Sequence, residues 1–388
     1  MKKYFGKLYL GGVLLISLSM SLTSCEGALD DILGEWSRPT PGSSTGGAVT
    51  SIDLDADEMK LAAGDKGQLT AKVDPAGTAV TWSSDQEEVA TVDANGLVTA
   101  VAVGTAIITA KAGDKKATCT VTVTPGLATP LTLEAITAGT IVVSKPRPGM
   151  KYSLNGGVKT AVTATPINVA IGDKVAFYGN GTSITSYYAS SSDYTNIAGG
   201  DAEVKVYGNI MSLVDETGFA TNIKLPAENT FRMLFNGNAK LTDASGLLLP
   251  ATTLADNCYY SMFLGCTSLT TAPELPATTL NSYCYAAMFN GCSSLTTAPE
   301  LKAETLVGDC YNSMFANCSN LSSVTCLATD ISASYCTSNW LLNVAATGTF
   351  IKAASMTRNG STIQTATNYP ENADGIPSGW TTANYVEP

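Results

Sequence analysis

The sequence predicts a multidomain protein whose mainly β N-terminal half is followed by an α/β solenoid of 26-residue coils. Two patterns support this prediction. In residues 51–125, short runs of alternating apolar and polar residues are separated by turn residues, as in a β-sandwich. Further along, the phrase Cys-Tyr-x-x-Met-Phe-x-x-Cys occurs three times, beginning at Cys258, Cys284 and Cys310. A fixed repeat of this length is typical of coils that stack and bury a shared core.

Composition narrows the classes of function. The chain of 388 residues is long enough for several domains, and it carries 22 basic and 33 acidic residues, a net charge of −11. This charge disfavours nucleic acid as a partner. The chain contains no histidine, which excludes Ser-His-Asp and Cys-His catalytic sets and His-ligated metals. We therefore expect no enzyme, and no catalytic, cofactor-binding or metal-binding residues.

Residues 1–24 have the features of a bacterial export signal. Lysines lie near the start, and the apolar run over residues 8–20 is too short to span a bilayer stably. The signal ends in Leu-Thr-Ser-Cys, which resembles the lipobox of bacterial lipoproteins. The resemblance implies that Cys25 is acylated and anchors the chain in a membrane. We expect the cell outer membrane, with the chain exposed at the surface, and a periplasmic orientation is the alternative. The alternative is an ordinary secretory signal with an incidental cysteine.

A tether and a first β domain follow the signal. Residues 25–50 are rich in Gly, Ser, Thr and Pro, so we expect a flexible tether. Residues 51–125 contain the motif Trp-Ser-Ser-x-x-x-x-Val-Ala-x-Val-Asp-x-x-Gly-x-Val-Thr, beginning at Trp82. This motif resembles the signature of the bacterial Ig-like domains of group 2. The resemblance implies a β-sandwich that acts as a stalk and carries no catalytic residues.

The next segment is expected to be a second small β domain, over residues 126–210. Its short alternating runs are separated by glycine turns. The solenoid is predicted over residues 211–345, with an N-terminal cap at its start, and a C-terminal cap is predicted over residues 346–388. Caps are needed because the end coils of a solenoid would otherwise expose their cores.

Each coil is predicted to contain a short helix and a short strand. Leu280, Cys284 and Met288 lie four residues apart, which would place them on one face of a helix. Gly291 follows at the point where a helix would end in a left-handed residue. The Leu-Thr-Thr-Ala run that comes next is expected to form one strand per coil, and Pro299 should interrupt it because proline lacks an N–H.

The repeat pattern resembles a known family. The pattern Met-Phe-x-Gly-Cys-x-x-Leu-x-x-Ala-Pro-x-Leu-Pro begins at Met262 and returns in register from Met288, with Lys302 in place of its last proline. It resembles the treponemal-type leucine-rich repeats of BspA-like bacterial surface proteins, although these coils are slightly longer and a proline interrupts each strand. The resemblance implies an α/β leucine-rich-repeat solenoid.

Apart from Cys25, the chain has nine cysteines, and seven of them recur in two columns of the repeat. We expect buried free thiols, because the repeat assigns each cysteine to a core-facing position. Disulfide bonds and a metal–thiolate site remain alternatives. Trp340 and Trp380 are expected to pack in the cap, with sugar stacking as the alternative.

These features predict a lipid-anchored surface protein that presents the solenoid for binding or adhesion to a protein or host-surface ligand. The alternative is a glycan-capture accessory lipoprotein, which would need exposed Trp or Tyr rings. We expect a monomer whose partners are the membrane, through the lipid on Cys25, and an unknown protein or glycan ligand. If Ala272 points inward, the alternation of a strand turns one position per coil outward, which gives a candidate ligand-facing stripe of Asp243, Thr271, Thr297 and Ser323. A second candidate surface is a tyrosine edge at Tyr259, Tyr285 and Tyr311.

Overall fold

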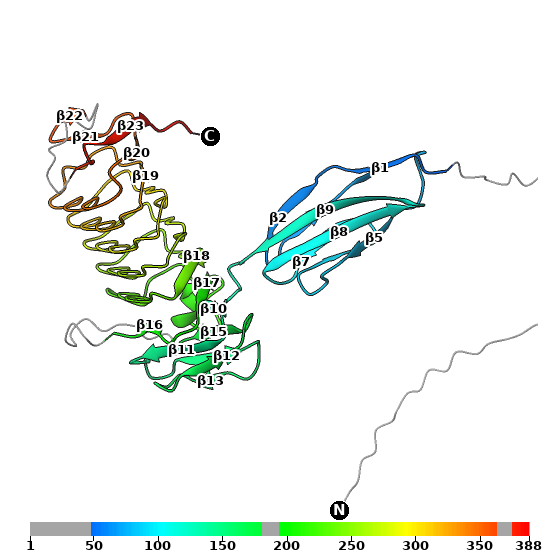
Figure 1. Cartoon of the computed structure of the whole chain (residues 1–388), viewed down its shortest axis with the longest axis horizontal. Coiled ribbons are helices and arrows are strands. Elements are labelled where there is room, and N and C mark those ends of the chain that lie inside the picture. The colour runs from blue at the N-terminus through cyan, green and yellow to red at the C-terminus, as the bar shows by residue number, and fades with distance from the viewer. Residues whose placement is uncertain (1–47, 181–193, 363–374, 388) are drawn as a thin grey trace, which may run out of the picture. The chain divides into compact units, whose positions relative to one another are not determined.

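The computed structural model describes residues 48–180, 194–362 and 375–387 (Figure 1). The expected signal peptide, its lipidation site Cys25 and nearly all of the tether lie outside these residues. Within the described part, the only helix is a 3₁₀ helix, η1, over Ile210–Leu213. None of the described helices has the length and hydrophobicity needed to cross a bilayer. The rest of the regular structure is strand.

The first module is a β-sandwich, as predicted. Its sheets have the strand orders β2-β9-β8-β5 and β3-β7-β6, and β1 pairs with β4. Side chains alternate along β8, where Ala106, Ile108 and Ala110 are buried between more exposed neighbours. The strands are β1 Ser51–Leu54, β2 Glu58–Ala62, β3 Lys66–Gln68, β4 Ala71–Asp74, β5 Thr81–Ser84, β6 Ala90–Val92, β7 Leu97–Ala100, β8 Gly104–Ala112 and β9 Lys115–Thr124.

The second β segment continues directly into the repeats. Its six-stranded sheet has the order β13-β12-β15-β10-β17-β18, and the last strand, β18, belongs to the first repeat. One hydrophobic core extends from Leu131 to Trp380. The strands are β10 Thr132–Ala135, β11 Gly139–Ser144, β12 Lys151–Leu154, β13 Thr160–Ala161, β14 Ile167–Val169, β15 Lys174–Tyr178, β16 Asn196–Gly199, β17 Val204–Asn209 and β18 Leu241–Leu248.

The second β segment also covers the first coil of the repeats. The Ile197 N–H, in β16, donates to the Leu234 carbonyl at 2.7 Å, and the Asn196 side-chain amide donates to the carbonyls of Met233 and Asn236. These carbonyls lie at the open end of the first coil. Because β16 supplies their donors, no buried carbonyl is left unpaired at these positions.

The predicted α/β solenoid is wrong, because its coils contain no helix. Residues 229–343, here called the coil stack, form stacked layers of turns (Figure 1). In each layer, every fourth residue has a positive φ, so a continuous helix cannot form. These positions are Asn229, Met233, Gly237, Asn257, Ser261, Gly265, Tyr283, Ala287, Gly291, Asp309, Ser313, Asn317, Tyr335, Asn339 and Asn343.

Backbone hydrogen bonds between layers replace the expected helix. The Tyr259 N–H donates to the Cys284 carbonyl at 3.0 Å, and the Phe263 N–H donates to the Met288 carbonyl at 2.8 Å. The N–H groups in between bond within the layer, such as Met262 to the Tyr259 carbonyl at 3.2 Å. From Asn257 to Cys266, alternate N–H groups therefore donate to the next coil and to the preceding turn, so that each has an acceptor without a helix.

The strands of the coil stack are shorter than the sequence pattern suggests. Pro273 and Pro299 interrupt them, as predicted, because proline cannot donate to a ladder. Most coils therefore pair only through isolated parallel bridges, such as Thr253 with Thr279. At the C-terminal end a parallel sheet, β19-β20-β23, and a hairpin, β21-β22, complete the structure. Their bounds are β19 Ser323–Cys326, β20 Gly348–Lys352, β21 Thr357–Arg358, β22 Ser361–Thr362 and β23 Trp380–Asn384.

Aromatic side chains form two columns in the core of the coil stack. In one column, Phe263 stacks on Phe289 with ring centroids 5.4 Å apart, and the planes are nearly parallel. In the other, Tyr285 stacks on Tyr311 at 6.2 Å, and Trp340 closes the column. Trp340 and Trp380 are both buried, as expected for packing residues. Burial of these rings provides much of the hydrophobic stabilisation available to each coil.

Substitution of Gly291 tests whether the left-handed positions of the coil stack favour glycine. The φ of Gly291 is +78°, a conformation that costs residues with a Cβ about 1–2 kcal/mol, and an added Cβ would meet no atom closer than 3.6 Å. Gly291→Ala should therefore lower the free energy of unfolding by about 1–2 kcal/mol, measured by denaturant titration. The control is Gly308→Ala, in the next coil, where φ is not positive and the nearest atom would be 3.5 Å away. This control should be neutral or stabilising by up to about 1 kcal/mol. Equal effects would refute the left-handed assignment.

Candidate functional site

The predicted stripe residues line up along the coil stack. Asp243 pairs with Thr271, and Thr297 pairs with Ser323, each through a parallel bridge. The row continues beyond the prediction, since Ser323 pairs with Thr349. The side chains of Thr271 and Thr297 are exposed, whereas those of Asp243 and Ser323 are partly buried. The stripe can thus offer hydroxyl groups to a ligand at regular intervals.

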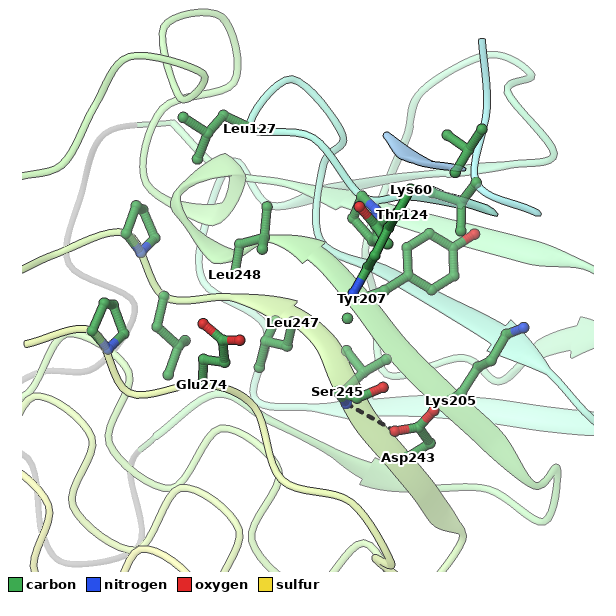
Figure 2. Close-up of a pocket in the computed structure, with 18 residues that line it drawn as sticks. Lys60, Thr124, Leu127, Lys205, Tyr207, Asp243, Ser245, Leu247, Leu248 and Glu274 are labelled. Atoms are coloured by element: carbon green, nitrogen blue, oxygen red, sulfur yellow. Dashed lines mark hydrogen bonds between the residues drawn. The ribbon is translucent and has the colours of Figure 1, made fainter. Parts of the chain in front are cut away.

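Asp243 lies at the edge of a pocket (Figure 2). Its carboxylate accepts a hydrogen bond of 2.8 Å from the Ser245 N–H, which fixes the start of the turn. The wall contributed by the coil stack combines the apolar Leu247 and Leu248 with the carboxylate of Glu274. On this side, the two acidic groups of Asp243 and Glu274 lie beside apolar surface, a combination that suits a binding surface.

The cysteine columns are buried inside the coil stack. All nine cysteines of the described residues are free thiols, and all are buried. In one column, the thiols donate hydrogen bonds to carbonyl groups of the preceding coil. The Sγ of Cys292 lies 3.1 Å from the Phe263 carbonyl oxygen, and the Sγ of Cys318 lies 3.0 Å from the Phe289 carbonyl oxygen. Burial raises the pKa of Cys258 to about 12, so this thiol stays protonated at neutral pH. Protonated buried thiols make poor nucleophiles and poor metal ligands.

The predicted tyrosine edge is wrong. Tyr259, Tyr285 and Tyr311 are at most 1% exposed and form the core column described above. Their burial raises the pKa of each hydroxyl well above its usual range. They lie inside because the coil is not a helix, so the residue beside each cysteine does not project from an outer face. These tyrosines cannot contact a ligand.

A different set of tyrosines, which the sequence patterns did not indicate, is exposed. Tyr283 and Tyr335 are 41% and 69% exposed and occupy the same position two coils apart. Between them lies Asp309, which accepts a hydrogen bond from the Tyr283 hydroxyl and thereby raises the pKa of that tyrosine. Asn257 takes the equivalent place one coil before Tyr283. The signal that could have identified this row is a spacing of 26 residues at a position that alternates between tyrosine and Asn or Asp.

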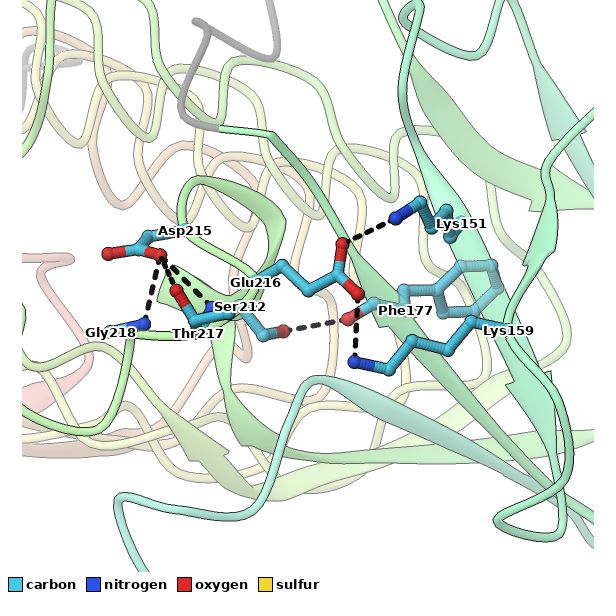
Figure 3. A network of polar contacts seen from close by, with 8 residues as sticks. All are labelled: Lys151, Lys159, Phe177, Ser212, Asp215, Glu216, Thr217 and Gly218. Atoms are coloured by element: carbon cyan, nitrogen blue, oxygen red, sulfur yellow. Dashed lines mark hydrogen bonds and ion pairs between the residues drawn. The ribbon is translucent and has the colours of Figure 1, made fainter. Parts of the chain in front are cut away.

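A charged cluster in the second β segment has a structural role (Figure 3). Glu216 accepts hydrogen bonds from Lys151 at 2.8 Å and from Lys159 at 2.9 Å, and these bonds lower the pKa of its carboxyl group. Nearby, the buried Ser212 hydroxyl donates to the Phe177 carbonyl at 2.8 Å. These contacts fasten η1 to the neighbouring sheet. Partly exposed ion pairs of this kind contribute little stability.

Metal chemistry has no visible site in the described residues. No group of three or more Cys, Asp or Glu side chains gathers there in a way that could hold an ion. The acidic side chain of Asp55 instead accepts a hydrogen bond from the Thr70 N–H at 2.9 Å, which lowers its pKa. The exposed groups of the coil stack are mainly hydroxyls, amides and tyrosine rings, which suit non-covalent binding.

Comparison with known proteins identifies the first module. Residues 48–121 match the family model of the bacterial Ig-like domain (group 2). This module is a bacterial Ig-like domain. The chain is 48% identical to a lacto-N-biosidase of Bifidobacterium bifidum over 84 residues, and 42% identical to an uncharacterized protein of Clostridium acetobutylicum over 82 residues. These matches cover 21% and 20% of the chain but only 8% of each relative.

Solved structures of an S-layer protein also match. Domains 4 and 5 of the S-layer protein SbsC are 28% identical to the chain, covering 20% of it and 52% of that structure, with a TM-score of 0.18. Domains 5 and 6 of the same protein are 16% identical, covering 33% of the chain and 84% of that structure, with a TM-score of 0.19. TM-scores this low carry no argument about the fold of the chain.

The buried thiols give a prediction about reactivity. The folded chain should resist alkylation at pH 8, because the thiolate is the reactive form and burial keeps the thiols protonated. With the chain from Glu26 to Pro388, which lacks Cys25, mass spectrometry should find nine labels per chain only after unfolding. Thr271→Cys, at an exposed position, serves as a positive control that should react at once. Rapid labelling of the native columns would contradict their burial.

The same thiols predict how stability depends on pH. An ordinary thiol ionises near pH 9.0, whereas burial raises the pKa of Cys258 and Cys326 to about 12. Above pH 9 the unfolded chain releases protons that the folded chain keeps, so the free energy of unfolding should fall as pH rises from 9 towards 12. Denaturant titrations at pH 8 and pH 10 measure this loss. Cys258→Ala should reduce the difference between the two titrations.

Proposed function

We propose that this protein is a lipid-anchored protein of the outer cell surface that presents its coil stack for binding or adhesion and catalyses no reaction. The observation that carries the proposal is the regular outer surface of the stack, where equivalent side chains recur from coil to coil in register. Repeat scaffolds bind through such extended surfaces. The target in this proposal is a protein or another ligand of a host surface, and the protein acts as a monomer.

The arrangement of the sequence supports this role. The signal peptide and the lipobox-like Leu-Thr-Ser-Cys supply an anchor at Cys25, and the residues after it are composed like a flexible tether. The Ig-like domain at residues 48–121 supplies a rigid β module between tether and repeats. A lacto-N-biosidase contains a similar segment. In this proposal the Ig-like domain is a spacer that carries the coil stack away from the membrane.

The stripe is the proposed contact surface for an extended protein ligand. Thr271 and Thr297 present hydroxyl groups that can donate and accept hydrogen bonds, and Asp243 adds an acceptor at one end. Bridged strands lie about 4.8 Å apart, so the side chains of neighbouring coils recur at a regular interval along the stripe. Regularly spaced hydroxyl groups would select a ligand by the positions of its hydrogen-bonding groups more than by its charge.

Anchoring is tested by replacing the acylated residue. Cys25→Ala removes the only thiol in the expected lipobox, so the variant should leave the membrane fraction and appear in the soluble fraction after an alkaline wash. The matched control is Ser24→Ala, which keeps a small residue before the cysteine and should remain with the membrane. Immunoblots of the two fractions measure the outcome. A Cys25→Ala protein that still pellets would reject the lipid anchor.

The stripe is tested by adding charge to it. The chain from Glu26 to Pro388 is first used to probe an array of host-surface proteins, and the affinity for its strongest target is then measured. Thr271→Lys with Thr297→Lys should weaken that affinity by about tenfold or more, because the added side chains cover the hydroxyl row. The control pair, Thr279→Lys with Thr305→Lys, adds the same charge at exposed positions outside the stripe. An unchanged affinity in the first pair would exclude the stripe as the binding surface.

A further inference from the structure

A row of side chains runs along the coil stack at the first left-handed position of each coil. The residues of this tyrosine row are Asn257, Tyr283, Asp309 and Tyr335, which follow one another at intervals of 26 residues. Backbone hydrogen bonds of 3.0 Å, from Asn257 to the Ser282 carbonyl and from Asp309 to that of Ser334, hold neighbouring coils together beside the row. The row lies in a separate part of each coil from the stripe.

Folding alone does not account for the two tyrosines. The φ angles of Tyr283 and Tyr335 are +54° and +53°, a conformation that Asn and Asp adopt far more readily than a bulky aromatic residue. Tyr335 is 69% exposed and gains little from burial, and Tyr283, at 41%, is only partly packed. Residues held in a conformation that is unfavourable to their backbone are characteristic of functional positions.

The polar neighbours of the row are arranged for recognition. The Tyr283 hydroxyl donates to the Asp309 carboxylate, which also accepts a hydrogen bond of 2.9 Å from Asn312, so ring and carboxylate hold each other in place. On the two preceding coils, the guanidinium of Arg232 lies 4.9 Å from the ring centroid of Tyr260. Aromatic faces therefore alternate with amide, carboxylate and guanidinium groups over neighbouring coils. A site fixed before the ligand arrives loses less entropy on binding.

We infer that the tyrosine row binds a neutral glycan chain lying along the coil stack, with sugar rings stacked on Tyr283 and Tyr335 and sugar hydroxyls bonded to Asp309 and Asn257. This inference rests on the proposed surface-binding function and assigns a ligand class to this part of the coils. The weakly positive C–H face of a pyranose ring matches the negative face of an aromatic ring. The tyrosines are two coils apart, about 10 Å at the usual strand spacing, which leaves room for one sugar ring over each.

Charge favours a neutral glycan over an acidic one. The chain has a net charge of −11, and the carboxylate of Asp309 lies between the two exposed rings. An acidic polysaccharide would be repelled by both. Uncharged sugar hydroxyls can donate to that carboxylate and accept from the Asn257 amide, which gives both groups a partner.

The inference is tested with the chain from Glu26 to Pro388 by affinity electrophoresis in gels that contain a neutral β-glucan, mannan or galactan. The wild type should be retarded by at least one of these polysaccharides, and not preferentially by polygalacturonate. Tyr283→Asn with Tyr335→Asn should weaken this binding by about tenfold or more. Asn suits the left-handed backbone, so the melting temperature of this variant should be unchanged or higher. A loss of binding therefore cannot be attributed to unfolding.

Two controls isolate the role of the rings. Tyr335→Phe keeps the stacking face and should retain binding, and the stripe pair Thr271→Lys with Thr297→Lys should bind the polysaccharide like the wild type. Failure of every neutral polysaccharide to retard the wild type, preference for polygalacturonate, or full affinity in the double Asn variant would each overturn the inference. Binding to the protein array in the absence of any polysaccharide binding would leave the proposed surface-binding function standing.

Discussion

The coil stack depends on one constraint: each buried backbone N–H needs a hydrogen-bond acceptor, although the chain forms no helix there. The chain meets it by alternation: the Ser261 N–H donates to the Ala286 carbonyl in the next coil, and the Leu264 N–H turns back to the Ser261 carbonyl. Alternation requires a left-handed residue at every fourth position, which explains Gly265 and its equivalents. This alternating set of backbone hydrogen bonds is here called the ladder. A buried N–H without a partner would cost about 1–3 kcal/mol, so the ladder leaves the backbone little conformational freedom.

The core follows from this ladder. Since each coil repeats the same conformation, equivalent side chains stack, and the aromatic columns have ring separations of 5.4 to 6.5 Å. The cysteine column fits the same rule, because a small thiol donor reaches the carbonyl of a phenylalanine in the preceding coil, as Cys266 reaches Phe235 at 3.2 Å. The cysteines therefore act as small buried residues with one weak hydrogen bond, and their reactivity is suppressed by the same burial that holds the coils together.

Sequence patterns predicted the features that depend on alternation and period. They predicted the Ig-like sandwich, the stacking of equivalent residues and the interruption of the strands at Pro273 and Pro299. The helix prediction failed because Leu254, Cys258, Met262 and Cys266 lie four apart throughout, whereas a helix has 3.6 residues per turn and would turn such a row by about 40° at each step. A period of four over this length indicates the ladder. The tyrosine row was missed because the direction of its side chains depends on left-handed residues that the helix prediction did not include.

The ladder also separates stability from recognition. Between Asn257 and Cys266 the backbone N–H groups are used either within the coil or between coils, so a ligand of the stack must be recognised mainly by side chains. The first left-handed position accepts Asn, Tyr, Asp and Tyr in successive coils while the backbone stays the same. A residue there can change at a cost of about 1–2 kcal/mol, without disturbing the aromatic columns. The side chain at this position can therefore change from coil to coil while the fold is preserved. The exposed tyrosines Tyr283 and Tyr335 are two such changes.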